Sequence, residues 1–271
     1  MKKHCKIIAE IGWNHMGDMN LAKEMIDSAA ESGADFCKFQ TWSVSDLKAG
    51  PWDTDGRREI YKKAELSYDQ HSHLKTYCES KNISFFTSVF NKKDINFLSS
   101  LKMSHIKIPS HEIYNTELIQ ECLNKFNKVL ISTGASKWDE IKKILNLKKK
   151  DNIVFMHCIS SYPLKAENVN FPRMEKLKKL SKEIGYSGHF AGIEDAIVAI
   201  CLGADYIEKH FTVDQKLPGR DNKFAILPED LKKISQFRDN FEHMNQDKGL
   251  DLQECEADIF NNYRGRWSKN G

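Results

Sequence analysis

Two lysines, Lys38 and Lys107, lie within short apolar stretches of this 271-residue sequence, where a charged side chain needs a partner or a ligand. Together with the Ser-Thr-Gly turn at residues 132–134, they suit a substrate that carries phosphate or carboxylate groups. For either lysine alone, an ion pair with Glu10 or Glu112, or a side chain that extends to solvent, is the alternative interpretation. The sequence therefore indicates an anion site and leaves the pairing of each lysine open.

Two histidines, His189 and His210, are 21 residues apart, which is the length of one strand–helix–strand step. Residues at the ends of neighbouring parallel strands lie at the same edge of a sheet, so the two imidazoles can face each other. Such a pair suits a divalent metal that keeps open positions for a substrate. A hydrogen-bonded core histidine is the alternative for each residue alone, and the paired placement favours the metal.

Short apolar runs alternate with longer amphipathic segments along almost the whole chain. Eight strand–helix units in this order predict an α/β fold, the (β/α)8 TIM barrel. A doubly wound open sheet is the alternative, but the sequence lacks the GxGxxG turn that usually follows its first strand. The predicted strands are residues 6–11, 36–40, 84–88, 105–109, 128–132, 153–158, 184–187 and 206–209. The predicted helices are residues 21–31, 68–81, 92–101, 116–124, 138–147, 174–182, 194–202 and 228–244.

The ends of the predicted strands are unusually polar. In a TIM barrel these ends form the face that carries the chemistry. Two long connections, residues 41–67 and 211–227, leave from the same face and are expected to be functional. So many polar groups at one barrel mouth favour a polar ligand over a purely structural network. They are Glu10, Asn14, His15, Lys38, Gln40, Lys107, Ser110, Glu112, Ser132, Thr133, His157, Ser160, Tyr162, Ser187, His189, Glu208, Lys209 and His210.

The composition excludes several classes of protein. A formal net charge of +3 is too small to indicate a nucleic-acid partner, and no stretch is long and apolar enough for a membrane span. The first residues do not read as a signal peptide. Seven cysteines without a CxxC pair suit reduced thiols, most of them in the core. We therefore expect a cytoplasmic protein.

Several segments in combination resemble the barrel domain of the N-acetylneuraminate (sialic acid) synthase family, which includes the legionaminate and pseudaminate synthases. The resemblance runs in order from about residue 6 to about residue 230. The first and last segments are the most specific, whereas KFQ or STG alone would carry little weight. The segments are IAEIGWNHMGD (8–18), KFQ (38–40), KIPSHE (107–112), STG (132–134), HCISSYP (157–163), GYSGHF (185–190) and GADYIEKHFTVD (203–214).

The resemblance implies a synthase that condenses phosphoenolpyruvate with an N-acylated amino sugar aldehyde and releases phosphate. The acceptor would be N-acetylmannosamine or a related diacetamido hexose, and the product a nonulosonic (sialic-type) acid. His189 and His210 match the ligands of the family's divalent metal, usually Mn²⁺ or Mg²⁺. The residues that match the phosphoenolpyruvate site are Lys38, Gln40, Lys107, Ser110, Ser132, Ser160, Tyr162 and Ser187.

Other matched residues concern the acceptor sugar and the catalytic steps. Glu10 and Glu112 match polar catalytic or sugar-binding residues, and Asp221 matches an acidic residue that contacts the sugar. Phe90 matches an aromatic position near the substrate, and Ser88 keeps the hydroxyl of the family's Thr-Pro-Phe segment.

The chain departs from the family pattern at three places. Ser88–Val89–Phe90 lacks the usual proline, and His111 adds bulk in KIPSHE. Gly188 stands where the family commonly has the aspartate of Ser-Asp-His, which removes a carboxylate beside a matched metal ligand. These differences bear on the acceptor more than on the type of reaction.

Typical members continue into a small antifreeze-like domain that reaches the partner's barrel in a dimer. We expect residues 1–247 to form the TIM-barrel catalytic domain and residues 248–271 a tail that resembles the family's interdomain linker. A homodimer is expected, and a separate chain that carries the C-terminal domain is a possible partner. Two other functions stay open: a phosphoenolpyruvate-dependent ulosonate-phosphate synthase, and a non-catalytic sugar-binding or partner subunit.

Overall fold

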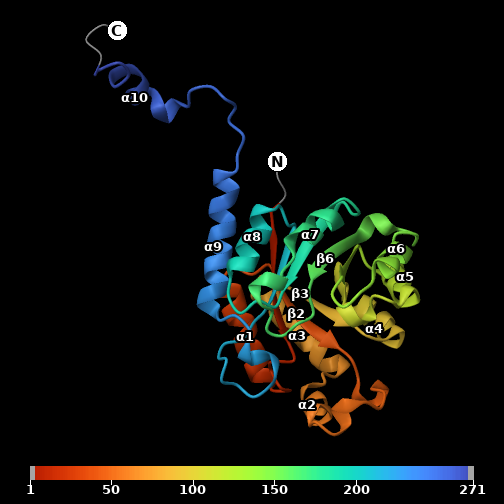
Figure 1. The fold of residues 1–271 in the computed structure, drawn as a ribbon. Helices are drawn as coiled ribbons and strands as arrows, with labels where there is room; N and C mark the ends of the chain where they lie inside the picture. The colour runs from red at the N-terminus through yellow and green to blue at the C-terminus, as the bar shows by residue number, and fades with distance from the viewer. Residues whose placement is uncertain (1–3, 268–271) are drawn as a thin grey trace.

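Eight parallel strands close into a barrel in chain order in the computed structural model, which describes residues 4–267 (Figure 1). Every strand pairs with its sequence neighbours, and β1 closes the ring against β8. The predicted (β/α)8 barrel is confirmed. The strands are β1 Lys6–Gly12, β2 Phe36–Thr41, β3 Ser84–Val89, β4 His105–Ile108, β5 Lys128–Ser132, β6 Ile153–Cys158, β7 Glu183–Gly188 and β8 Tyr206–His210.

The strands are buried on both faces, because the barrel interior lies on one side and the helices cover the other. β6 and β7 have no exposed residue along their length. Near-continuous apolar runs of this kind are typical of parallel strands that are covered on both faces. This is why the strand positions were recognisable from the sequence, with bounds that differ by at most two residues.

Most of the predicted helices are confirmed as well. Helix α1 begins where the Asp18 carboxylate accepts hydrogen bonds from two backbone N–H groups, and α3 begins with a capping box formed by Ser67 and Gln70. The helices that cover the barrel are α1 Met19–Glu31, α3 Tyr68–Ser80, α4 Ile95–Ser100, α5 Thr116–Lys125, α6 Trp138–Ile144, α7 Phe171–Lys178, α8 Glu194–Cys201 and α9 Pro228–Met244.

Three of the predicted helices have wrong bounds. The helix at 92–101 divides into a 3₁₀ turn, Lys92–Asp94, and α4. Helix α7 spans Phe171–Lys178 and not the predicted 174–182, and Pro172 in the first turn favours the earlier start. Helix α6 ends at Ile144 rather than at residue 147, and two turns follow it.

The connection after β2 is a structured excursion and not an irregular loop. It contains two 3₁₀ turns and a helix, α2 Arg57–Ala64, which projects beyond the barrel in Figure 1. The Glu65 carboxylate closes the excursion, because it accepts hydrogen bonds from the Ser43 hydroxyl at 2.7 Å and the Val44 amide at 2.9 Å. The connection after β8 is held by a bridge between Phe211 and Ile226.

The segment after α9 leaves the barrel. It runs away from the other helices in Figure 1 and carries a short helix, α10 Ala257–Asn262, with exposed apolar side chains such as Ile259 and Phe260. Residues 1–3 of the predicted domain and 268–271 of the predicted tail lie outside the described residues, and the division at residue 247 stays a prediction. Among residues 4–267, no helix is long and apolar enough to cross a membrane.

The cysteine prediction holds for most of the seven residues. Cys201 and Cys255 are exposed, and the other five are buried with free thiols. Burial raises the pKa of Cys5 and of Cys122 to about 12, so these two thiols stay protonated. Such thiols act as small apolar core residues.

Candidate active site at the barrel mouth

Strand register explains which polar side chains meet at the C-terminal mouth of the barrel. Glu10 of β1 is the register partner of Lys38 on β2 and of His210 on β8, while Ser88 of β3 is the partner of Lys107 on β4. Because side chains alternate across a strand, residues of matched register on neighbouring strands point to the same face. Closure of the barrel therefore gathers residues from both ends of the sequence in one place.

Four charged side chains form a connected network inside this mouth. The Lys38 ammonium lies 2.7 Å from Oε2 of Glu10 and 3.7 Å from Oε1 of Glu208, and it donates to the Ser88 hydroxyl at 2.9 Å. The Lys107 ammonium lies 2.6 Å from Oε2 of Glu208. Lys38 thus has the predicted Glu10 partner, whereas Lys107 pairs with Glu208 and not with Glu10 or Glu112.

Glu208 is the anionic centre of this network. Burial alone would raise the pKa of this carboxyl, but Lys107 and Lys38 outweigh burial and hold it at about 2. The Ser187 hydroxyl also donates to it at 3.0 Å. In contrast, burial raises the pKa of Glu10, against the attraction of Lys38. The network therefore holds one firmly ionised carboxylate and one that accepts a proton more readily.

Small residues leave room for an anion beside the lysines. A side chain at Gly134 would place its Cβ 2.3 Å from the Ser160 hydroxyl and 2.7 Å from the Ser110 hydroxyl, so only glycine fits. Two hydroxyls thus converge over a bare backbone turn, next to the buried Ser132 at the end of β5. Hydroxyl and backbone donors in this arrangement suit phosphate or carboxylate oxygens.

The two predicted metal ligands face each other as expected from their spacing. The rings of His189 and His210 have centroids 5.4 Å apart, and the Tyr162 ring lies 4.1 Å from that of His189. Nδ1 of His189 donates to the Ile159 carbonyl at 2.9 Å, so Nε2 carries the lone pair when the ring is neutral. Burial lowers the pKa of His189, but the nearby Cys158 outweighs burial and raises it. Burial holds the pKa of His210 well below its ordinary value, so this imidazole is neutral.

These two imidazoles fit a metal that takes part of its coordination from the substrate or water. Nδ1 of His210 is buried and has no hydrogen-bond partner among the described residues; Oδ2 of Asp221 is 3.6 Å away. Residues 4–267 contain no group of three or more histidine, cysteine or acidic side chains arranged to hold a metal. The protein would therefore supply two nitrogen ligands and leave several positions open.

An aromatic row borders the site on the side of Asp221. The Trp13 indole donates to Oδ2 of Asp221 at 2.5 Å and stacks on Tyr61 of α2 with ring centroids 5.0 Å apart. Tyr61 meets Trp42 edge-on at 5.6 Å, and the Trp42 indole donates to Gln40 at 3.2 Å. Gln40 in turn donates to Oε1 of Glu10 at 2.9 Å. The row therefore joins the β2 excursion to the charged network.

Two predicted residues lie at the rim and outside the network. Glu112 is half-buried on the 3₁₀ turn Ser110–Glu112, where burial raises its pKa, and Lys48 is the nearby charge that opposes this. Phe90 packs against His111 with ring centroids 5.3 Å apart. Neither is joined by a described hydrogen bond to the two lysines of the network.

The sequence prediction missed the aromatic row and the role of Glu208. Glu208 was visible as a charged residue that alternates with His210 on β8, but nothing local names Lys107 as its partner. Trp13 and Trp42 lie in or beside segments that resemble the family, so the sequence could have indicated that they lie near the site. Tyr61 carried none, because it lies in a helix that was not predicted.

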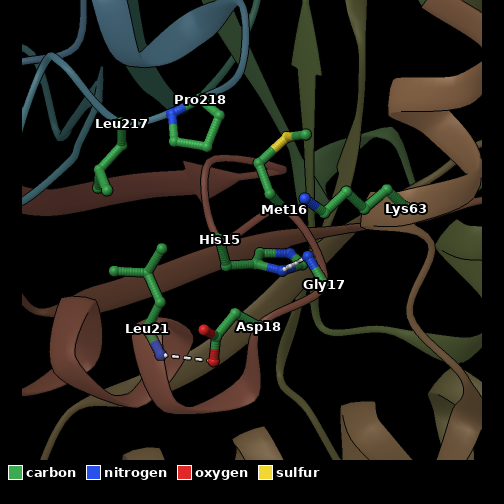
Figure 2. A pocket seen from close by; sticks show the side chains of 8 residues that line it. All are labelled: His15, Met16, Gly17, Asp18, Leu21, Lys63, Leu217 and Pro218. Atoms are coloured by element: carbon green, nitrogen blue, oxygen red, sulfur yellow. Dashed lines mark hydrogen bonds between the residues drawn. The ribbon is translucent and has the colours of Figure 1, made fainter.

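A separate hollow of about 510 Å³ lies beside the mouth, and His15 is the one residue of the predicted polar mouth that lines it. Figure 2 shows it between the loop after β1, Lys63 of α2, and Leu217 and Pro218 after β8. His15 lines it, and its Nδ1 accepts a hydrogen bond from the Gly17 amide at 3.0 Å. The charged network, not this hollow, carries the candidate chemistry.

Fold and site together define a barrel protein with a buried, charged mouth at the face where enzymes of this fold carry their active sites. Residues 25–249 match the NeuB family model, and the chain belongs to the NeuB family.

Relatives and a solved structure agree with this assignment. The chain is 36% identical to an N,N'-diacetyllegionaminic acid synthase of Campylobacter jejuni, over 86% of this chain and 75% of that protein. It is 37% identical to an enzyme of the same name from Legionella pneumophila, over 86% and 70%. The N-acetylneuraminic acid synthetase of Leptospira borgpetersenii, solved in complex with citrate, superposes with a TM-score of 0.85 at 32% identity, over 98% of this chain and 93% of that one.

Proposed function

We propose that this chain condenses phosphoenolpyruvate with the open-chain aldehyde of an N-acylated amino sugar, to give a nonulosonic acid and phosphate. Family membership and two relatives that are named legionaminic acid synthases support the reaction class. The single observation that carries the proposal is the buried network of Lys38, Lys107, Glu10 and Glu208 at the barrel mouth. Lys107 has only one hydrogen-bond partner in this network, so the arrangement leaves donors for a ligand, which a purely structural ion pair does not need.

The two lysines would bind the phosphate and carboxylate groups of phosphoenolpyruvate. The hydroxyls of Ser110 and Ser160 over Gly134 would add donors to the same anion, as would those of Ser132 and Ser187. The carboxylates of Glu10 and Glu208 already hold the two ammonium groups in place. Little reorganisation is then needed when the substrate arrives, which favours catalysis.

The bonds change in a defined order. The C3 carbon of phosphoenolpyruvate attacks the sugar aldehyde carbon, which leaves an oxocarbenium centre at C2 and an alkoxide that takes up one proton of the attacking water. Water adds to C2; when the C–O bond to phosphate then breaks, the C2 hydroxyl becomes the carbonyl and its proton leaves with the phosphate. We assign the removal of the water proton to Glu10, because it is buried beside Lys38 and its pKa is raised by burial. Glu112, at the rim, is assigned to the sugar side.

A divalent cation, Mn²⁺ or Mg²⁺, bound by His189 and His210 would polarise the aldehyde oxygen. The ring nitrogens described above support this assignment. Tyr162, packed against His189, would limit access of bulk water to this corner of the site.

We assign the acceptor sugar to the side of Asp221. Its carboxylate is fixed by the Trp13 indole and would accept a hydroxyl hydrogen bond from the sugar. Trp42 and Phe90 offer apolar ring surface near the mouth, which suits the methyl of an acetamido group. N-acetylmannosamine or a diacetamido hexose meets these requirements. The expected homodimer and a separate C-terminal-domain partner stay predictions.

The test measures phosphate release from phosphoenolpyruvate with Mn²⁺ across a panel of amino sugars, each in unphosphorylated and phosphorylated form. We expect release with one unphosphorylated N-acylated sugar, lost when metal is removed or when His189 and His210 are both replaced by alanine. Release only with a phosphorylated sugar would instead support an ulosonate-phosphate-type synthase. If a sugar binds but no combination of sugar and phosphoenolpyruvate releases phosphate, the result would support the non-catalytic subunit. Failure to bind phosphoenolpyruvate would refute the proposal.

A further inference from the structure

A second buried ion pair lies directly behind the active site, between the barrel wall and α8. The Lys209 ammonium lies 2.9 Å from both carboxylate oxygens of Asp195, and these side chains are only 3% and 2% exposed. The Tyr186 hydroxyl donates to Oδ2 of Asp195 at 2.9 Å. Tyr186 and Lys209 lie on the outer face of β7 and β8, opposite to the face of Ser187 and Glu208, and Asp195 meets them from α8.

This pair lies beside a position where the chain lacks a side chain. Gly188 ends β7 and is the register partner of Lys209 on β8. A Cβ at Gly188 would lie 2.2 Å from Oδ2 of Asp195, so the Asp195 carboxylate fills the space that a side chain at position 188 would enter. An aspartate at position 188 would therefore bring its own carboxylate next to the Lys209 ammonium.

The pair also fixes the backbone that carries the site residues. The Lys209 ammonium donates to the Phe190 carbonyl at 2.8 Å, one residue beyond His189. The His189 carbonyl accepts from the Leu164 amide at 2.8 Å. Lys209 itself stands between Glu208 and His210 on β8. Any shift of the pair would therefore move residues on both strand ends.

We infer that Asp195 is a positioning residue for His189, and that its carboxylate occupies the space that a carboxylate on position 188 would take. In this chain the carboxylate comes from the first turn of α8 and reaches the same ammonium. The inference rests on the proposed function only through the role of His189. The loop after β7 is thus held by the side chain of Asp195, which lies six residues beyond His189 in the sequence.

The experiment exchanges the carboxylate between the two positions. Three variants are compared with the wild type: Asp195→Ala, Gly188→Asp, and the double variant with both changes. Asp195→Ala leaves Lys209 buried without its partner, and Gly188→Asp forces a collision with the Asp195 carboxylate. The double variant removes the collision and returns one carboxylate to Lys209. Asp139→Ala is the matched control. Asp139 also lies in the first turn of a helix, α6, and pairs with a lysine, Lys142, but it is exposed.

Three measurements are made on each variant: the melting temperature, kcat and KM at a temperature where all variants are folded, and the imidazole NMR signals of His189, assigned with His189→Gln. We expect Asp195→Ala to lose about 10- to 100-fold in kcat/KM and to shift the His189 signals. The double variant should return to within about threefold of the wild type and restore those signals, whereas Asp139→Ala should change nothing.

Two outcomes would overturn the inference. If Asp195→Ala lowers only the melting temperature and leaves kcat and the His189 signals unchanged, the pair is merely structural. If the double variant is no better than Asp195→Ala, a carboxylate at position 188 does not take the same place. Because the NMR signals need no substrate, they decide the inference even if the wild type fails to turn over any sugar on the panel.

Discussion

Lys107 and Lys209 lie on opposite sides of the barrel wall, and both are almost completely buried. The three ammonium donors of Lys209 are matched by three acceptor oxygens, two from Asp195 and one from the Phe190 carbonyl. Among the described residues, Lys107 has one hydrogen-bond partner, Oε2 of Glu208. An ammonium group has three donors, so Lys107 keeps two for a ligand. A buried lysine with spare donors thus indicates a binding site, whereas one with all donors used indicates a scaffold.

The largest effect is expected on the side that faces the substrate. Replacing Lys107 with methionine should lower kcat/KM for phosphoenolpyruvate by about 10³-fold, because it removes a charged donor from a water-poor site. The fold should survive, since Glu208 keeps Lys38 and Ser187 as partners. Steady-state kinetics and thermal melting check this, with the exposed Lys142→Met as control. Unchanged kinetics would mean that the spare donors do not bind substrate.

For the Lys209–Asp195 pair, we expect the larger effect of a substitution on stability. Lys209→Met should cost about 3–4 kcal/mol of unfolding free energy, because it leaves the Asp195 carboxylate buried without a countercharge. Replacing both residues, as Lys209→Met with Asp195→Leu, should recover most of that loss. Urea denaturation measures both. If Lys209→Met is as stable as the wild type, Lys209 adds no stability and the contrast between Lys107 and Lys209 fails.

His15 tests what happens to a buried ionisable group for which burial outweighs the attraction of the nearby Asp18 carboxylate. Burial lowers the pKa of His15 to about 4, so the folded state keeps it neutral while the unfolded state takes up a proton below about 6.5. Its contribution is therefore present above pH 6.5 and is lost as the pH falls towards 4. Between pH 7 and pH 5, the wild type should lose about 2 kcal/mol more unfolding free energy than His15→Asn. Equal losses, measured by urea denaturation at both pH values, would contradict this prediction.

The smallest effect is expected at the aromatic row. Trp13→Phe keeps ring surface against Tyr61 but removes the indole donor to Asp221. Loss of one hydrogen bond to a carboxylate should raise KM for the sugar about 5- to 10-fold. KM for phosphoenolpyruvate should stay the same, because the lysines are untouched. A change in the phosphoenolpyruvate KM instead would place Trp13 on the wrong side of the mouth.

The local pattern of apolar and polar residues determined the strands and helices, which alternate along the chain. The bounds of β5, β6 and α9 agree with the sequence prediction to the residue, because apolar runs and helical periodicity are local properties. The polar residues at the strand ends were recognisable for the same reason. Helix α2 was not recognisable, since it buries only Ala64 and therefore shows no apolar periodicity.

Only the tertiary structure decided which side chains became partners. Glu208 meets Lys107 across 101 positions of sequence, and Trp13 meets Asp221 across 208. Asp195 fills the space beside Gly188 because the first turn of α8 packs against the end of β7. The physical reason is barrel closure: strand register fixes which ends adjoin, and a buried charge must then take whatever partner lies within reach.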